Sequence, residues 1–161
     1  MNRQEYNKKI CDYLLSNEEF TSKLESVDPD LTFINMLYLL IEDYPQQRFG
    51  QLVCNYMISD YRNPNPSATT LWLQEYLFPG NPDPFFEESH YTYYRLTGEV
   101  PEDIRKELDE KKGKKIYYKL DNGSTGIGVL SGVCVNPYHD EWNWKIDDKK
   151  LISTNIHIKL L

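Results

Sequence analysis

The chain has 161 residues, with 25 acidic and 18 basic side chains and a formal net charge of −7. Its hydrophobic content of 40% and aromatic content of 14% are sufficient for a packed core, which excludes wholesale disorder. No apolar run reaches the roughly 18 to 20 residues that cross a bilayer, and the N-terminus lacks the apolar stretch of a secretory signal. We therefore expect a cytoplasmic protein with no membrane segment.

Charge divides unevenly along the chain. Residues 1–112 contain 11 Lys or Arg against 20 Asp or Glu, whereas residues 113–161 contain 7 against 5. Because an acidic surface repels phosphate backbones, nucleic-acid binding is not expected in the first part. The three cysteines and three histidines show no recognisable metal-ligand spacing, so we predict neither a metal site nor a cofactor.

Helical periodicity predicts an acidic helical module over residues 1–112. Apolar residues recur at helical spacing in four segments, 4–15, 20–27, 32–44 and 47–58. A short helix is predicted over 71–78, and the aromatic-rich stretch 84–96 is interpreted as another, although its aromatics also suit a strand. The clearest helix signal is 101–112, where proline opens the run, acids occupy the first turn and two lysines close it.

The periodicity changes at residue 113. Four segments alternate or are rich in β-branched residues and are separated by turns: 115–120, 125–135, 142–146 and 156–160. They predict a small antiparallel β domain over 113–161, either an SH3-like barrel or a curled sheet. The expected fold class is therefore α+β. The spacing Gly123-x-x-Gly126-x-Gly128 favours a hairpin over a phosphate loop, since it leads into a strand and not a helix.

Alternation places several polar side chains on one face of this predicted sheet. They are Tyr117, Lys119, Lys145, His157 and Lys159. If the strands are neighbours, this face could hold an anionic ligand, a nucleic-acid strand or an acidic protein patch. Two simpler interpretations remain open, because solvent-facing lysines prevent sheet aggregation and the face could also pack on the chain's own acidic helices.

Cys134 and His139 lie close together in the sequence, within segment 134–142. A thiol and an imidazole can form a nucleophilic pair, and a histidine beside carboxylates can bind a divalent metal. No third group that would orient such a pair can be named. We therefore interpret this segment as a buried cysteine followed by a polar loop, and predict no catalytic residue.

Two segments of the helical module carry a resemblance: Arg48-x-Gly50-Gln51-x-x-x-Asn55 and, further on, Asp83-x-Phe85-x-x-Glu88. They resemble a pattern of small uncharacterised bacterial and phage proteins that pairs R-x-G-Q-x-x-x-N with D-x-F-x-x-E/D. The resemblance covers residues 32–96. It implies a compact helical module with Arg48, Gln51, Asn55, Asp83 and Phe85 as structural residues, and it implies no activity. We expect Arg48 to pair with Glu42, Asp43 or a carboxylate within 83–88.

The first hypothesis for function is a non-enzymatic binding or accessory protein of phage or bacterial type, such as an inhibitor or sequestering protein that acts on host machinery. Its partner would be a protein or a small anionic ligand, since tyrosine and tryptophan provide large contact areas at interfaces. The alternatives are nucleic-acid or nucleotide binding by the basic β face, and a small hydrolase centred on Cys134 or His139. Whether the chain forms a homo-oligomer is left open.

Overall fold

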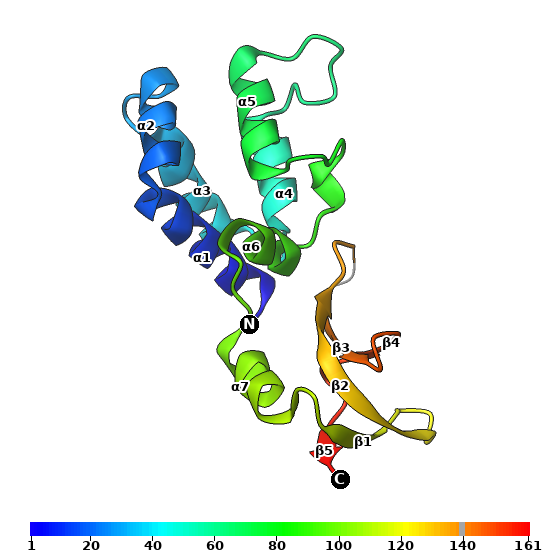
Figure 1. Cartoon of the computed structure of the whole chain (residues 1–161). Coiled ribbons are helices and arrows are strands. Elements are labelled where there is room, and N and C mark those ends of the chain that lie inside the picture. Colours follow the sequence, from blue (N-terminus) through cyan, green and yellow to red (C-terminus); the bar gives the residue numbers. More distant parts are fainter. Residues whose placement is uncertain (139–140) are drawn as a thin grey trace. The chain divides into compact units, whose positions relative to one another are not determined.

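The computed structural model describes residues 1–138 and 141–161. The chain folds into two compact units, Met1–Glu99 and Val100–Leu161. The first is built from helices, and the second contains one helix and an antiparallel sheet (Figure 1). The predicted α+β fold class is thereby confirmed. Within the described part of the chain, no helix combines the length and the apolar character needed to cross a lipid bilayer.

The helical unit is assembled from helices of different types. In chain order they are α1 (Arg3–Ser16), α2 (Glu18–Val27), α3 (Thr32–Asp43), α4 (Phe49–Leu52), the π-helix η1 (Val53–Met57), α5 (Ala68–Leu77), the 3-10 helix η2 (Pro84–Phe86) and α6 (Ser89–Thr97). Short polar residues start three of the α-helices. The side chains of Asn2, Asn17 and Ser67 accept hydrogen bonds from free N–H groups of the first turns of α1, α2 and α5.

Apolar side chains from all of the α-helices of this unit meet in one core. Ile10 and Leu14 of α1, Leu37 of α3 and Phe49 of α4 have no exposed surface. The helix α1 is central, because it contacts α2, α3 and α6. The spacing of these residues at three and four positions is what the sequence pattern predicted, and their burial stabilises the unit through removal of apolar surface from water.

Two of the predicted helices differ from the structure. The segment predicted over 47–58 begins as α4 and continues as the π-helix η1, in which Ile58 N donates to Val53 O, five residues earlier, at 2.9 Å. The segment predicted over 84–96 is divided into η2 and α6. Glu87 and Glu88 adopt extended backbone angles between the two helices, and their carboxylates pair with Arg95 and Arg3.

The sheet unit consists of α7 (Glu102–Lys111) and five antiparallel strands. The strands are β1 (Lys115–Lys119), β2 (Thr125–Val135), β3 (Trp142–Ile146), β4 (Lys150–Ser153) and β5 (Ile158–Leu160), in the order β4-β3-β2-β1-β5. The sheet is open at β4 and β5, so of the two arrangements that the sequence left open the closed SH3-like barrel is not formed. The long strand β2 joins the two halves, with an irregular register between Leu130 and Gly132.

The sequence predicted four strands and missed β4. The turn between β3 and β4 contains Asp147 and Asp148, which both adopt positive φ angles, 52° and 58°. Hairpin turns of this kind are usually recognised by a glycine, and this turn has none. In addition, β4 buries only Ile152 of its four residues, which leaves almost no alternation to detect.

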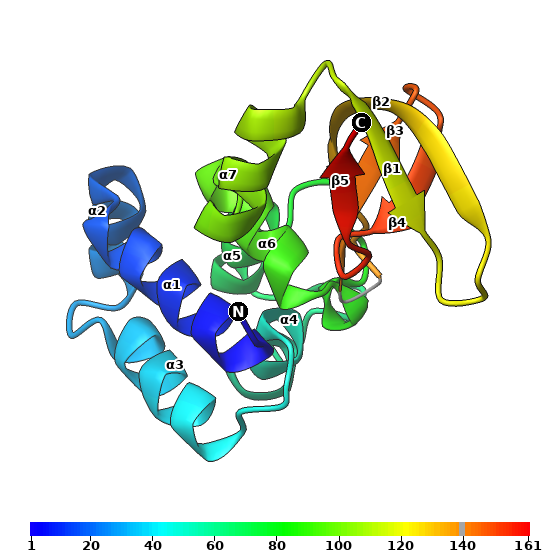
Figure 2. The same ribbon diagram turned by 90° about the horizontal axis from the view of Figure 1, so that it is seen from below.

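The helix α7 packs with the sheet, so the compact units divide at residue 99 where the sequence predicted a boundary at 112. Its side chains Ile104 and Leu108 lie against the apolar core of the sheet, which includes Ile116, Trp144 and Ile158. Lys111 Nζ also donates to Ile158 O at 3.1 Å. Figure 2 shows the helix alongside the sheet. One face of the sheet is therefore covered by α7.

Two glycines on the second strand of the first hairpin make room for core side chains. Gly123 lies in the turn with a φ of +88°, and β1 and β2 then pair as the predicted hairpin. A Cβ atom at Gly126 would lie 2.3 Å from the Tyr118 ring, and one at Gly128 would lie 2.4 Å from Ile146. These glycines leave room for two core side chains, which explains their spacing without any phosphate.

Candidate functional site

The two segments of the resemblance pattern meet in the helical unit. Gly50 lies so close to the second segment that an added Cβ atom would be 2.0 Å from the carbonyl oxygen of Pro84. Arg48 Nε donates to the carbonyl oxygen of Phe85 at 3.2 Å, and Arg48 N donates to Gln51 Oε1 at 2.8 Å. The two segments thus form one contact, in which α4 packs on η2.

The buried side chain of Glu88 stabilises this contact by pairing with two arginines. Its carboxylate accepts two hydrogen bonds from Arg3, at 2.9 and 3.1 Å, and Arg48 Nη1 lies 3.9 Å away. Arg48 therefore has its carboxylate partner within 83–88, one of the positions that the sequence suggested. Burial lowers the pKa of the Arg48 guanidinium, and the nearby charge of Glu88 opposes that shift.

Glu87 has no exposed surface, and each of its oxygens has a partner. One oxygen accepts from Arg95 at 2.8 and 3.1 Å and from Thr92 at 3.2 Å, and the other accepts from Asn81 at 3.0 Å. Arg95 also donates to the carbonyl oxygen of Leu77. This network ties the end of α5 and the following loop to α6.

Asp83 and Phe85 hold a second arginine at the surface. Arg62 Nη2 lies 3.1 and 3.2 Å from the two carboxylate oxygens of Asp83, and its guanidinium lies 5.8 Å from the centre of the Phe85 ring. Arg48 lies 5.7 Å from the same ring. Four of the five pattern residues therefore have structural contacts, whereas Asn55 is exposed on η1.

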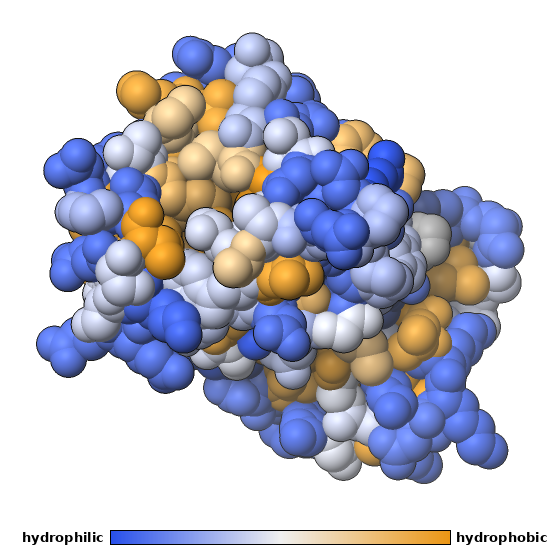
Figure 3. All heavy atoms as spheres, turned by 90° about the horizontal axis from the view of Figure 1, so that it is seen from above, coloured by the Kyte–Doolittle hydropathy of each residue, from blue (hydrophilic) through white to orange (hydrophobic). Residues whose placement is uncertain are grey.

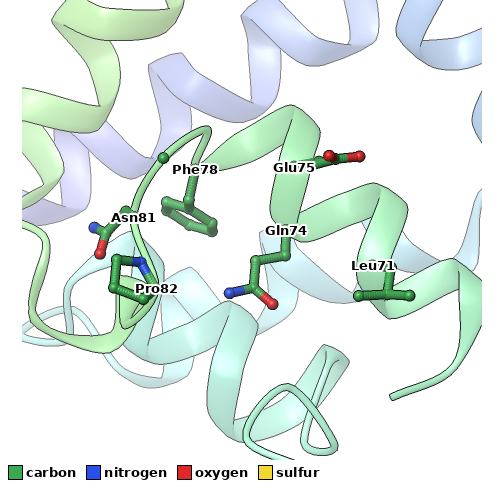
Figure 4. Close-up of a pocket in the computed structure, with 7 residues that line it drawn as sticks. Leu71, Gln74, Glu75, Phe78, Asn81 and Pro82 are labelled. Carbon is green, nitrogen blue, oxygen red and sulfur yellow. The ribbon is translucent and has the colours of Figure 1, made fainter. Parts of the chain in front are cut away.

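An open groove lies between α5 and the loop that follows it. It has a volume of about 650 Å³ and is lined by Leu71, Gln74, Glu75, Phe78, Gly80, Asn81 and Pro82, and we call it the α5 groove. In Figure 4 the side chains of Phe78 and Gln74 lie toward Pro82, and that of Glu75 points away. Phe78 forms the floor of the groove. The centre of its ring lies 6.2 Å from that of Phe49, and the Arg95 guanidinium, which is held by Glu87, lies 5.7 Å from it. The core and the Glu87 network therefore fix the position of Phe78.

On the sheet, the register brings three of the five predicted face residues together. Tyr117 lies directly opposite Lys159 of β5, and Lys119 follows two positions along β1. On the other side, Tyr117 lies opposite Ile127 of β2, which is 60% exposed. His157 is exposed and immediately precedes β5. The face opposite to these residues is the core, since Ile116 and Ile158 are fully buried.

Lys145 lies apart from this group, although it is on the same face. It is opposite Gly132, whereas Tyr117 is opposite Ile127, five residues earlier on β2. That offset corresponds to roughly 15 Å along the strand. Lys145 therefore lies outside the group that Tyr117, Lys119 and Lys159 form.

The cysteines do not form a reactive site within the described residues. Burial raises the pKa of both the Cys11 and the Cys54 thiol to about 12, so both are protonated at neutral pH. Cys134 is half-buried on β2, and its suggested partner His139 lies outside the described residues. Among the residues described, no group of three His, Cys, Asp or Glu side chains is arranged to hold a metal ion.

The chain matches no known protein family, no curated protein sequence and no solved structure. These comparisons therefore assign it no function. The α5 groove was not predicted from the sequence, and the only signal for it is the run Pro79-Gly80-Asn81-Pro82, which ends α5 and turns the chain back. Ile127 was also missed, since its exposure depends on the strand pairing.

Proposed function

We propose that the protein is a non-enzymatic binding protein whose helical unit holds an apolar segment of a partner protein in the α5 groove. The observation that carries this proposal is the groove itself, whose volume of about 650 Å³ is in the range of ligand pockets. The proposed activity is stoichiometric, as in an inhibitor or a sequestering protein that acts by occupying its partner.

The lining of the groove suits an apolar side chain. Leu71 is 51% exposed at one end, although it is aliphatic, and Pro82 forms the opposite wall. Burial of this surface by a partner would remove apolar area from water, which is the main favourable contribution to most protein association. Because Phe78 is already fixed by its core contacts, the floor of the groove is pre-organised for binding.

Charge favours a partner segment that also carries basic residues. Residues 1–99 contain 7 Lys or Arg against 15 Asp or Glu, a net charge of −8, and Glu75 stands exposed at the rim of the groove. Figure 3 shows orange apolar atoms at the surface of the helical unit among blue polar ones. We therefore propose an occupant with one or two large apolar side chains flanked by lysine or arginine.

A peptide array tests this proposal with a matched pair of variants. Peptides that bind the wild-type chain should contain apolar residues next to basic ones. Leu71→Asp should weaken their binding at least about tenfold, because it places a charge in an apolar contact. Leu39→Asp is the control, since Leu39 is 66% exposed on α3 and does not line the groove. An array without any binding peptide, or equal losses for the two variants, would contradict the proposal.

A further inference from the structure

The strands of the sheet unit carry positive charge without any negative charge. The five strands contain five lysines and no aspartate or glutamate. The described acidic residues of the unit lie in its turns and in α7, for example Asp121, Asp147 and Glu107. Since α7 packs on the core face, the outer face of the sheet is not covered by these helical acids.

Tyr117 lies at the centre of this outer face. Its neighbours along β1 are Lys115 and Lys119, and its neighbours across the sheet are Lys159 and Ile127. Lys115, Lys119, Lys159 and Ile127 are all exposed, and among the described residues none of the three lysines has a carboxylate partner. We call these five residues the Tyr117 cross. The half-buried Tyr117 thus has as strand neighbours one aliphatic residue and three lysines without a carboxylate partner among the described residues.

We infer that the Tyr117 cross binds single-stranded nucleic acid. Unpaired bases can stack on an aromatic side chain whatever their identity, and Tyr117 with Ile127 provides such an apolar platform. The phosphates that flank a stacked base would meet Lys115 and Lys119, which lie roughly 13 Å apart along the strand. Lys159 would neutralise the backbone from the side of β5.

A single strand fits this surface better than the other anionic partners. A duplex hides the faces of its bases, so it could use the lysines and not the tyrosine. An acidic protein segment could also use the lysines, but it has no need of an aromatic ring between them. The overall charge of −7 opposes any polyanion, so we expect modest affinity that depends strongly on salt.

Fluorescence anisotropy of the full chain with labelled 12-nucleotide oligo-dT and oligo-U tests the inference. Three lysine–phosphate contacts predict a salt slope near −2, so raising the salt from 50 to 200 mM should weaken binding roughly tenfold to twentyfold. Lys119→Glu combined with Lys159→Glu should abolish binding. Lys145→Glu is the matched control on the same face, about 15 Å along the strand, and should change the affinity less than about threefold.

Substitutions of Tyr117 distinguish the contribution of base stacking from that of charge. Tyr117→Ala should weaken binding roughly tenfold, whereas Tyr117→Phe, which keeps the ring, should bind like the wild type. Several results would overturn the inference: no binding at 50 mM salt, equal losses for Lys145→Glu and the double variant, equal losses for the two Tyr117 variants, equal affinity for a duplex, or equal affinity for polyglutamate. The site lies in the sheet unit, so these results are independent of those for the α5 groove.

Discussion

The two units of this protein use charge in opposite ways. In the helical unit the four arginines all bond to carboxylates, and two of these carboxylates, Glu87 and Glu88, are buried. In the sheet unit the core is apolar and no strand carries an acidic residue. Four of the five strand lysines lie on the face opposite the core, and Lys150 lies 5.3 Å from the centre of the Tyr118 ring. The acidic unit therefore pairs its arginines with carboxylates, two of them buried, whereas the nearly neutral unit leaves most of its strand lysines at the surface.

This contrast shows why net charge is a poor guide to a binding surface. A buried ion pair is sensitive to the loss of either partner, because the remaining charge has no water to replace it. A lysine on a solvent-facing strand position can change with little effect on folding and remains available to a ligand. Substitutions of the buried ion pairs in the first unit should therefore affect stability, and substitutions of the solvent-facing strand lysines in the second should affect binding.

The largest expected effect is that of Glu87→Ala. This change removes the carboxylate that Arg95, Asn81 and Thr92 share, and it leaves the Arg95 guanidinium without its counter-charge. We expect the free energy of unfolding to fall by about 3 to 5 kcal/mol. Urea unfolding followed by circular dichroism at 222 nm measures it. The control is Glu102→Ala, because Glu102 forms only an exposed pair with Lys106. Equal losses for the two variants would remove the contrast.

A second test compares two variants, each with one added methyl group, one in each unit. Gly50→Ala places a Cβ atom 2.0 Å from the backbone oxygen of Pro84, so α4 and η2 must separate. We expect the free energy of unfolding to fall by about 1 to 3 kcal/mol, the usual effect of overpacking. Gly132→Ala is the matched change in the sheet unit, where no atom lies within 4 Å of the new methyl and φ is not positive. If Gly50→Ala unfolds at the same urea concentration as the wild type, the contact between the two pattern segments is not needed for folding.

A third test is the loss of stability of the helical unit at alkaline pH. Burial raises the pKa of Cys11 from 9.0 to about 12, and burial with the hydrogen bond to Glu99 raises that of Tyr93 from 10.0 to about 12. Because the folded state holds these protons more tightly, the stabilisation is complete below pH 9 and is lost as the pH rises from 9 toward 12.

Urea unfolding at pH 8, 9, 10 and 11 measures this dependence. The variant Cys11→Ala with Tyr93→Phe removes these two titrating groups and leaves Cys54, whose pKa burial also raises. Its free energy of unfolding should therefore decline less steeply over this range than that of the wild type. Identical slopes for the two proteins would show that these groups do not govern the alkaline behaviour.

Much of the fold follows from periodicity in the sequence. The helical segments, the hairpin after Gly123 and the change from helix to sheet near residue 113 were predictable, because a buried face repeats every 3.6 residues in a helix and every two in a strand. The sequence could not show which unit α7 belongs to, because the apolar residues Ile104 and Leu108 do not reveal which core the helix covers. The strand β4 was hidden by a turn of two aspartates without glycine.

The candidate site was less predictable than the fold. The alternation of polar residues predicted which face of the sheet carries the lysines. Only the strand register shows that Lys145 lies away from Tyr117 and that Ile127 lies beside Tyr117. Lys115 was not included in this face because it is the first residue of β1. The α5 groove depends on how a loop folds back over a helix, and no local pattern encodes that. The segments around Gly50 and Pro84 meet in a close backbone contact, which the sequence alone does not reveal.

One measurement tests most directly the claim that the sheet unit keeps its positive charge for a ligand while the helical unit uses its own for folding. It is a titration of the ¹⁵N-labelled full chain with oligo-dT, followed by amide chemical shifts at low salt. The account predicts shifts confined to β1, β5 and residues 125–129, around Tyr117. Shifts centred on Arg48 or Arg62, or no shifts at all, would contradict it.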